Sequence, residues 1–341
     1  MFYFEDDKLT DVIICCGANI KRNFSDAPFP GKMTDEAKGD MCERILTALD
    51  DRNAVYDSDD VDDDMLLDVR DLMEDVCFAG KDDDDDGDLK IILGPGQKAM
   101  ITVNRRDHLN ISSYVSGNDP LDALRICRGA ESLLSEAGIY AFDPDFGYLT
   151  ASPSDTGSGA RAMFLMHLQG LGRLEKIDEV KDELRGKGLS LRAVMDPNSD
   201  DAAEFYCLVS RITMGKSAED IFRETRDTAI DLALREREAR DELIIGDTDA
   251  FADNVVRALG ILVNARLMYY TELISLYGDV RAGLTGGLLD GNLAEFDDFI
   301  ERMSPYRLTQ EHGNMTDRED ELLRADLSRE KFAKYIRINN I

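Results

Sequence analysis

The chain changes its hydrophobic pattern near residue 217, and this change limits the folds that it can adopt. Before that point, short β-prone runs between turn residues predict strands, at 11–16, 89–94, 99–104, 147–152, 189–195 and 205–213. After it, apolar residues recur at helical spacing, through 217–244, 251–278 and 316–336. We therefore expect a sheet-containing domain followed by a helical one.

Local signals refine this expectation. Helical patterns near Thr34 and at about 120–137 interrupt the strand candidates, and a GPGQ turn at Gly94 joins two of them as a hairpin. This mixture predicts an α+β fold with a mainly antiparallel sheet flanked by helices, followed by an α-helical C-terminal domain. The expected boundaries are 1–222, with an acidic insert near 57–88, and 223–341. Ser217 with Asp220 and Thr316 with Glu319 read as helix N-terminal capping pairs.

The charge balance excludes some partners. The 341 residues include 70 acidic and 40 basic ones, a formal net charge of −30. Such a surface repels nucleic acid and anionic membranes. No apolar run reaches transmembrane length and the first residues do not resemble a signal peptide, so we expect a cytoplasmic protein.

One acidic stretch imitates a metal site. Asp82, Asp84, Asp86 and Gly87 match the start of a calcium-binding loop, but Leu93 stands where a bidentate Glu is needed. Without that ligand a solvated acidic loop is the better interpretation. The six cysteines contain no CxxC pair, so we expect no metal site in this chain.

Seven segments, in chain order, carry a family resemblance. They are VIICCGANIKRNF (12–24), VNRRDHLNI (103–111), GYLTASPSDTGSGARAMFLMHL (147–168), LRAVMDPNSDDA (191–202), YCLVSRITMGKSAEDI (206–221), RALGILVNARLM (257–268) and LLRADL (322–327). Together they resemble the bacterial protein-arginine kinases of the ATP:guanido phosphotransferase (phosphagen kinase) family. The resemblance implies a guanido kinase-like catalytic domain with a helical C-terminal domain. It also implies ATP and magnesium as ligands and a homodimer as the assembly.

Phosphoryl transfer to a guanidinium needs cations on the nucleotide phosphates and carboxylates on the acceptor. By resemblance, Arg161 and Arg192 stand at nucleotide-binding arginines. Gly17, Asn19 and Asn110 stand where the family has three further arginines. Losing one aimed donor typically costs about 10²- to 10³-fold in rate. The substitutions therefore predict a weakened ATP site.

The acceptor site is altered more strongly. Arg105 and Arg106 replace the two glutamates of the family's V-N-E-E-D-H motif, while Asp107 and His108 are retained as framing residues. Two like charges about 4 Å apart repel by about 4 kcal/mol at an effective dielectric near 20. A cationic acceptor would thus be repelled where the family attracts it, and the base is missing. Ser152 also replaces a cysteine of that site.

The resemblance extends to a phosphoarginine-binding motif in the helical half. Arg324 matches the end of its R-D-x-x-R-A pattern, but Asp320 and Glu321 stand where Arg and Asp would be. These two changes weaken the expectation of phosphoarginine binding.

Three functions remain open at this point. The first is a protein-arginine kinase-like pseudokinase that binds a protein partner, either an active arginine kinase or the quality-control machinery. The second is an active, divergent kinase in which Asp107, Asp155 or Asp200 supplies a displaced carboxylate and lysines such as Lys21 replace arginines. The third uses the cations Arg105, Arg106, Arg161 and Arg192 to hold a different anionic ligand. Arg161 could equally be a structural arginine paired with a carboxylate.

Overall fold

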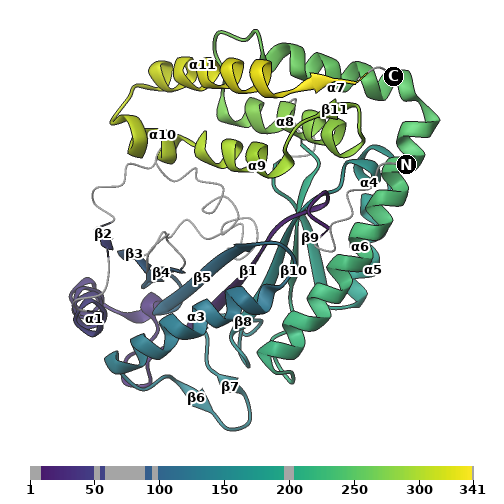
Figure 1. Cartoon of the computed structure of the whole chain (residues 1–341). Helices are drawn as coiled ribbons and strands as arrows, with labels where there is room; N and C mark the ends of the chain where they lie inside the picture. Colours follow the sequence, from purple (N-terminus) through teal and green to yellow (C-terminus); the bar gives the residue numbers. More distant parts are fainter. Residues whose placement is uncertain (1–8, 50–53, 58–88, 94–98, 196–202, 340–341) are drawn as a thin grey trace.

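The computed structural model describes residues 9–49, 54–57, 89–93, 99–195 and 203–339 of the chain (Figure 1). Its centre is an eight-stranded sheet in the order β2-β3-β4-β5-β1-β8-β10-β9, in which all neighbours are antiparallel. The strands are β1 (Ile13–Arg22), β2 (Ala54–Asp57), β3 (Leu89–Leu93), β4 (Ala99–Val103), β5 (Leu109–Ser116), β8 (Ala160–His167), β9 (Leu189–Ala193) and β10 (Phe205–Ser210). The predicted antiparallel sheet is thus confirmed.

Helices complete the sheet domain and build the C-terminal half. Those within the sheet domain are α1 (Asp35–Ala48), α3 (Pro120–Leu134), α4 (Gln169–Arg173) and α5 (Ile177–Gly186), with 3₁₀ turns η1 (Pro30–Lys32) and η4 (Ser135–Ala137). The later helices are α6 (Ala218–Gly246), α7 (Thr248–Leu262), α8 (Tyr270–Thr285), α9 (Leu293–Arg302), α10 (Pro305–His312) and α11 (Asp317–Tyr335). Two short ribbons, β6 (Phe142–Asp143) with β7 (Gly147–Tyr148) and β11 (Leu289–Asp290) with β12 (Arg337–Ile338), stand apart from the main sheet.

Strand β8 is buried along its whole length and separates the cores of the molecule. Met163 and Leu165 belong to the core shared with the C-terminal helices, whereas Phe164 and Met166 belong to a core shared with α5 and α6. This alternation follows from the two-residue period of a strand. The apolar run at 163–166 is therefore core, and helices cover both faces of the sheet.

The two halves of the chain share an extensive interface. In Figure 1, α7 to α11 gather above the sheet and the long helix α6 runs down one side of it. Helix α6 packs on β8 and β10, so it belongs to the sheet domain's surface as much as to the helical region. The predicted boundary at residues 222–223 falls inside this continuous helix.

The predicted helix over 251–278 is wrong as a single element. The structure has two helices, α7 and α8, separated by residues 263–269. Hydrogen bonds to α11 stabilise the segment between the two helices. The Met268 N–H donates to the Glu321 carbonyl at 3.2 Å, and Arg324 donates to the Met268 carbonyl at 3.0 Å. The backbone groups that a continuous helix would have satisfied internally are thus satisfied by tertiary contacts.

Smaller differences have local causes. The strand predicted at 147–152 ends at Tyr148, because Thr150 and Ala151 bond to neighbouring loop groups rather than to a strand. The first strand continues to Arg22, well beyond the predicted Cys16. Both predicted caps are confirmed: the Ser217 side chain accepts from the Asp220 N–H, and Thr316 and Glu319 form a full capping box. The GPGQ turn and the calcium-like loop lie outside the described residues.

A buried arginine ties the helical region to the sheet domain. Arg281 on α8 is fully buried and donates to the carbonyls of Asp11 and Thr10, at 2.8 and 2.7 Å, just before β1. It also donates to the Asp297 carboxylate on α9, at 3.0 Å. A single guanidinium thus joins α8, α9 and the start of the central strand.

Replacing this arginine should destabilise the fold strongly. Arg281→Met removes the cation from buried acceptors, so we expect a loss of about 3–5 kcal/mol in the free energy of unfolding, measured by urea denaturation at neutral pH. Arg257→Met is the matched control, because the Arg257–Asp253 pair is exposed on α7 and should contribute less than about 1 kcal/mol. Equal effects of the two substitutions would contradict the assignment.

His167, at the end of β8, makes the fold sensitive to acid. The ring is fully buried and neither nitrogen has a hydrogen-bond partner among the described atoms. Burial, together with the charges of Arg281 on α8, Arg240 on α6 and Arg173 on α4, holds its pKa well below the ordinary value of 6.5. Below that pH the unfolded chain takes up a proton that the folded chain excludes, so stability present above pH 6.5 is lost as the pH falls.

This loss can be measured with a variant that does not titrate at this position. We expect the wild-type protein to lose about 1.4 kcal/mol more per pH unit than His167→Leu as the pH falls below the unfolded-state pKa. Urea denaturation between pH 7 and pH 5 gives both curves. Parallel pH dependences would show that His167 is not responsible.

Candidate functional site

One face of the sheet collects most of the candidate residues. Within β1, Asn19 lies opposite Ser112 of β5 on one side and opposite Arg161 of β8 on the other. Lys21, two residues along on the same face, lies opposite Asn110. Segments up to about 150 residues apart in the chain are therefore brought together by sheet register.

Gly17 lies at the start of this face and has no room for a side chain. A Cβ at this position would come within 2.7 Å of the Tyr114 ring and 3.0 Å of the Met163 sulfur. Tyr114 and Met163 are its cross-strand partners on β5 and β8. In this chain, therefore, the space around position 17 is filled by core packing and cannot accept an arginine.

The two asparagines at former arginine positions bond to each other. The Asn19 amide donates to Asn110 Oδ1 at 2.7 Å and to Ser112 Oγ at 3.1 Å, and both asparagines are buried. Both side chains are neutral amides, and the buried Asn19 Oδ1 has no hydrogen-bond partner among the described atoms. Positions 17, 19 and 110 thus contribute packing and internal hydrogen bonds rather than positive charge.

The strongest electrostatic feature of the face is a carboxylate between two cations. Asp155 accepts from Lys21 Nζ at 2.9 Å and forms an ion pair with Arg161, and each of the three side chains is largely buried. Arg161 also donates to Ser154 Oγ at 3.1 Å, whereas its Nε has no hydrogen-bond partner among the described atoms. Arg161 is therefore paired with an internal counterion, as expected of a structural arginine.

Two further arginines border this cluster. Burial lowers the pKa of Arg192 on β9, and the nearby charges of Arg211 and Arg161 lower it further. Burial also lowers the pKa of Arg161, against the attraction of Asp155, with Arg211 adding to the shift. The sequence reasoning missed Arg211, although the motif comparison contained the signal: it occupies the Gln position in the family's Y-Q-I-S-N-Q run.

Arg105 and Arg106 lie in the loop that joins β4 to β5, residues 104–108. Arg105 is half-buried and Arg106 is exposed. Asn104 opens the loop with a φ of 56°, and its N–H donates to the His108 carbonyl at 3.1 Å. Both arginines thus project from a tight, backbone-closed turn.

The retained Asp107 and His108 hold this turn in place. Asp107 accepts from the Asn23 amide at 2.5 Å and the Ala151 N–H at 2.7 Å, and burial raises its pKa despite these bonds. His108 Nδ1 accepts from the Phe24 N–H at 3.0 Å and Nε2 lies 2.9 Å from the Pro28 carbonyl, which fits a neutral ring. Burial lowers its pKa accordingly. These bonds are structural and link the loop to the end of β1.

The remaining candidates near the acceptor site are less constrained. Ser152 is half-buried, and its hydroxyl lies 2.9 Å from Ser154 Oγ. Asp200 lies outside the described residues. Among the residues that are described, no group of three His, Cys, Asp or Glu side chains is placed to hold a metal ion.

A nucleotide with magnesium fits these residues only in part. Arg161, Arg192 and Arg211 could donate to phosphate oxygens, and the buried Nε of Arg161 has no partner among the described atoms. Asp155, however, already neutralises Lys21 and Arg161, and Asp107 is buried in structural bonds. The site therefore offers positive charge to an anion, whereas Asp155 and Asp107, its two described candidate carboxylates, are already engaged.

Arg324, the remaining arginine of the phosphoarginine motif, is occupied by the protein itself. It is 1% exposed and donates to the carbonyls of Met303 and Met268, at 2.8 and 3.0 Å. It also pairs with Asp320, one turn earlier on α11. Glu321 pairs with Arg318 at 3.4 Å. The structure thus gives Arg324 a role in joining α11 to the segments before α8 and α10, which leaves it few donors for a ligand.

Fold and site together define a guanido kinase scaffold, and comparison with known proteins agrees. Residues 40–239 match the model of the ATP:guanido phosphotransferase C-terminal catalytic domain. Residues 248–340 match that of the protein-arginine kinase McsB C-terminal domain. The chain belongs to the ATP:guanido phosphotransferase family.

Its curated relatives narrow the class further. It is 26% identical over 307 residues to a protein-arginine kinase of Caldanaerobacter subterraneus, covering 89% of this chain and 91% of the relative. It is 27% identical over 315 residues to that of an Exiguobacterium species, covering 91% and 89%. The resemblance found in the motifs is therefore confirmed over nearly the whole chain.

Solved structures support the fold. A lombricine kinase matches with a TM-score of 0.53 and 17% identity, over 73% of this chain and 71% of that one. The substrate-free duplicated taurocyamine kinase of Schistosoma mansoni matches with a TM-score of 0.56 and 16% identity, over 77% of this chain and 41% of that one. Across the described ranges, no helix is long and apolar enough to span a membrane.

Neutralising Asp155 tests how far this carboxylate closes the cationic face. Asp155→Asn should increase the affinity for ATP with magnesium at least tenfold, because Lys21 and Arg161 lose their counterion and become available to phosphate. Isothermal titration calorimetry measures the change. Asp182→Asn is the control, since Asp182 pairs with Arg185 on the exposed face of α5. An unchanged or weaker affinity in Asp155→Asn would count against the internal counterion.

Proposed function

We propose that this chain is a protein-arginine kinase-like pseudokinase that binds protein partners without transferring phosphate. It would act as an adaptor, by pairing with an active arginine kinase or by joining a quality-control assembly. Family membership supports the scaffold, and the substituted residues of the site support the loss of chemistry.

The observation that carries the proposal is the charge arrangement around Asp155. The carboxylate holds Lys21 and Arg161 in place of a nucleotide. The acceptor loop carries Arg105 and Arg106 where the family has glutamates. A guanidinium entering this region would meet cations, and the described carboxylates nearby are already engaged. Loss of an aimed general base is worth roughly 10²- to 10⁴-fold by itself.

The active alternative requires a displaced carboxylate. Asp107 is 2% exposed and accepts two structural hydrogen bonds, so it cannot reach an acceptor without dismantling its loop. Asp155 is 3% exposed and ion-paired. Asp200 lies outside the described residues, and the active-kinase alternative now depends on this carboxylate.

A second candidate function has one observation in its favour. The charges of Arg211 and Arg161 lower the pKa of Arg192, and the charge of Arg211 also lowers the pKa of Arg161, as expected of neighbouring guanidinium groups. Convergent cations at the end of a sheet can hold a phosphate or a carboxylate compound. The chain could then serve as a sensor of an anionic metabolite.

Direct assay tests the leading proposal. Purified protein incubated with ATP, magnesium and an arginine-rich protein substrate should form no phosphoarginine above background, because the described candidate bases, Asp107 and Asp155, are already engaged. The Bacillus subtilis protein-arginine kinase, a curated relative with 27% identity over 242 residues, serves as the active control at equal concentration. Phosphoarginine formation at a rate comparable to that control would overturn the proposal.

A further inference from the structure

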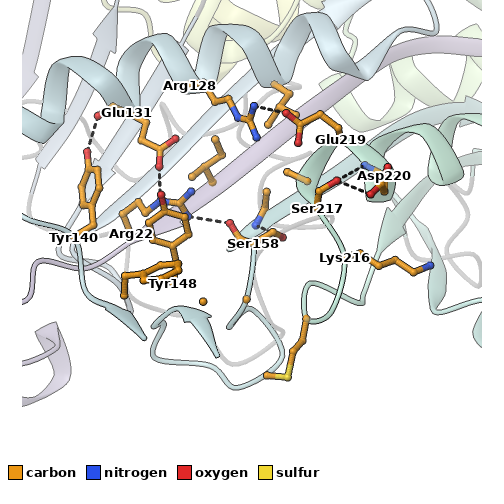
Figure 2. Close-up of a pocket in the computed structure, with 18 of the residues that line it drawn as sticks. Arg22, Arg128, Glu131, Tyr140, Tyr148, Ser158, Lys216, Ser217, Glu219 and Asp220 are labelled. Carbon is orange, nitrogen blue, oxygen red and sulfur yellow. Dashed lines mark hydrogen bonds and ion pairs between the residues drawn. The ribbon is translucent and has the colours of Figure 1, made fainter. Parts of the chain in front are cut away.

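The structure contains a large pocket whose lining includes none of the candidate phosphoryl-transfer residues (Figure 2). Its volume is about 910 Å³, and it lies between α3, the β6–β7 ribbon and the loop that leads into α6. The pocket is lined by Ile20, Arg22 and Ala160. The residues that alternate with these on β1 and β8 are Asn19, Lys21 and Arg161. The pocket therefore opens on the opposite face of the sheet from the Asp155 cluster.

The lining of this back-face pocket carries more negative than positive charge. Each of its three cations lies beside a lining carboxylate: Arg22 with Glu131, Arg128 with Glu219, and Lys216 with Glu224. Asp145 and Asp220 are additional carboxylates of the lining. Figure 2 shows the Arg22–Glu131 and Arg128–Glu219 pairs of this lining. The surplus is negative, so the pocket complements a cationic ligand.

Its lip is unusually apolar for an exposed surface. Phe142, Phe146 and Met214 are 59%, 55% and 47% exposed, and all three line the opening. Exposed apolar groups that gather at a concave site, rather than lying singly, mark an interaction surface. The lip thus suits an apolar side chain next to the cationic one.

One wall already shows how the pocket holds a guanidinium. The Arg22 guanidinium lies 3.5 Å from the centre of the Tyr148 ring, and its Nε bonds to Glu131 at 2.5 Å. An aromatic face and a carboxylate on one cation is a favourable arrangement for arginine. Phe146 and Asp145, next to each other in the β6–β7 ribbon, offer the same two chemical groups to solvent.

We propose that the back-face pocket docks a segment of a partner protein that carries an arginine or lysine beside an aromatic residue. The cation would face the surplus carboxylates and the aromatic ring would pack on Phe142, Phe146 and Met214. A second copy of this chain is a poor occupant, because each copy carries a net charge of −30. The biological meaning of this site rests on the proposed adaptor role, but its binding does not depend on whether the opposite face transfers phosphate.

Peptide binding to the full chain tests the site. The probe is a fluorescein-labelled dodecapeptide with alternating arginine and phenylalanine between glycine and serine spacers. It should bind saturably by fluorescence anisotropy at 150 mM salt. Peptides with glutamate for arginine, or with serine for phenylalanine, should bind at least tenfold more weakly. Free L-arginine should displace the probe only at far higher concentration, since it lacks the aromatic group.

Matched variants separate the pocket from general attraction to an acidic protein. Phe146→Ser and Glu224→Lys should each lower the affinity for the probe peptide at least tenfold. Ile245→Ser and Asp231→Lys should change this affinity less than twofold. Ile245 is 81% exposed at the far end of α6, and Asp231 lies about two turns beyond Glu224 on the same helix, outside the pocket lining. All four sites are exposed, so each variant should fold.

Several results would overturn the docking site. The first is an absence of saturable probe binding, and the second is an equal loss of probe affinity in the pocket and control variants. The third is self-association in sedimentation that Phe146→Ser abolishes, because this face would then be a contact between copies of the chain. Because the probe assay contains no ATP, its failure leaves the kinase assay unaffected. Conversely, an active kinase with a functional pocket would refute the pseudokinase proposal alone.

Discussion

The double burial of β8 is the constraint on which the rest of the structure depends. With both faces covered, Met163 and Leu165 face the C-terminal helices, whereas the even-numbered residues of β8 face α5, α6 and α3. The same alternation puts Arg161 and His167 on one face, at opposite ends of the strand. One end thus meets the candidate site and the other meets the buried arginines of the domain interface. A register slip of one residue would exchange these environments, so the site and the interface are specified together.

The arrangement of charges, more than the shape of the site, differs from what phosphoryl transfer to a guanidinium needs. The cations that remain are neutralised within the chain or converge on each other, and the asparagines at former arginine positions bond to one another. Internal pairing of this kind reduces the positive charge that is available to a phosphate, although the buried Arg161 Nε has no partner among the described atoms. Gly17 reinforces this conclusion by packing rather than charge, because Tyr114 occupies the space that an arginine would need.

The two faces of the sheet then differ in what they can offer. The face with Asp155 is built from buried ion pairs, whose rearrangement costs stability. The opposite face keeps a wide opening with exposed aromatic groups and partly exposed charges. An open pocket with exposed aromatic groups on its lip has the surface properties of a binding site.

The sequence by itself determined the antiparallel α+β domain, the helical C-terminal half, the family and the positions at which its motifs depart from those that they resemble. These follow from local periodicity and from motif letters, which need no knowledge of distant contacts. It could not show that Asp155 holds both Lys21 and Arg161, that Arg211 joins the cations, or that residues 263–269 break a helix, because each depends on partners far away in the chain. Arg324 illustrates the limit well: its motif indicated ligand binding, but only the packing of α11 against the Met268 and Met303 carbonyls decided that its donors are already used. The sequence specifies which side chains carry charge, but only the tertiary structure specifies the partner of each charge. The reason is that a buried polar group must pair with the groups that the fold places within hydrogen-bonding distance.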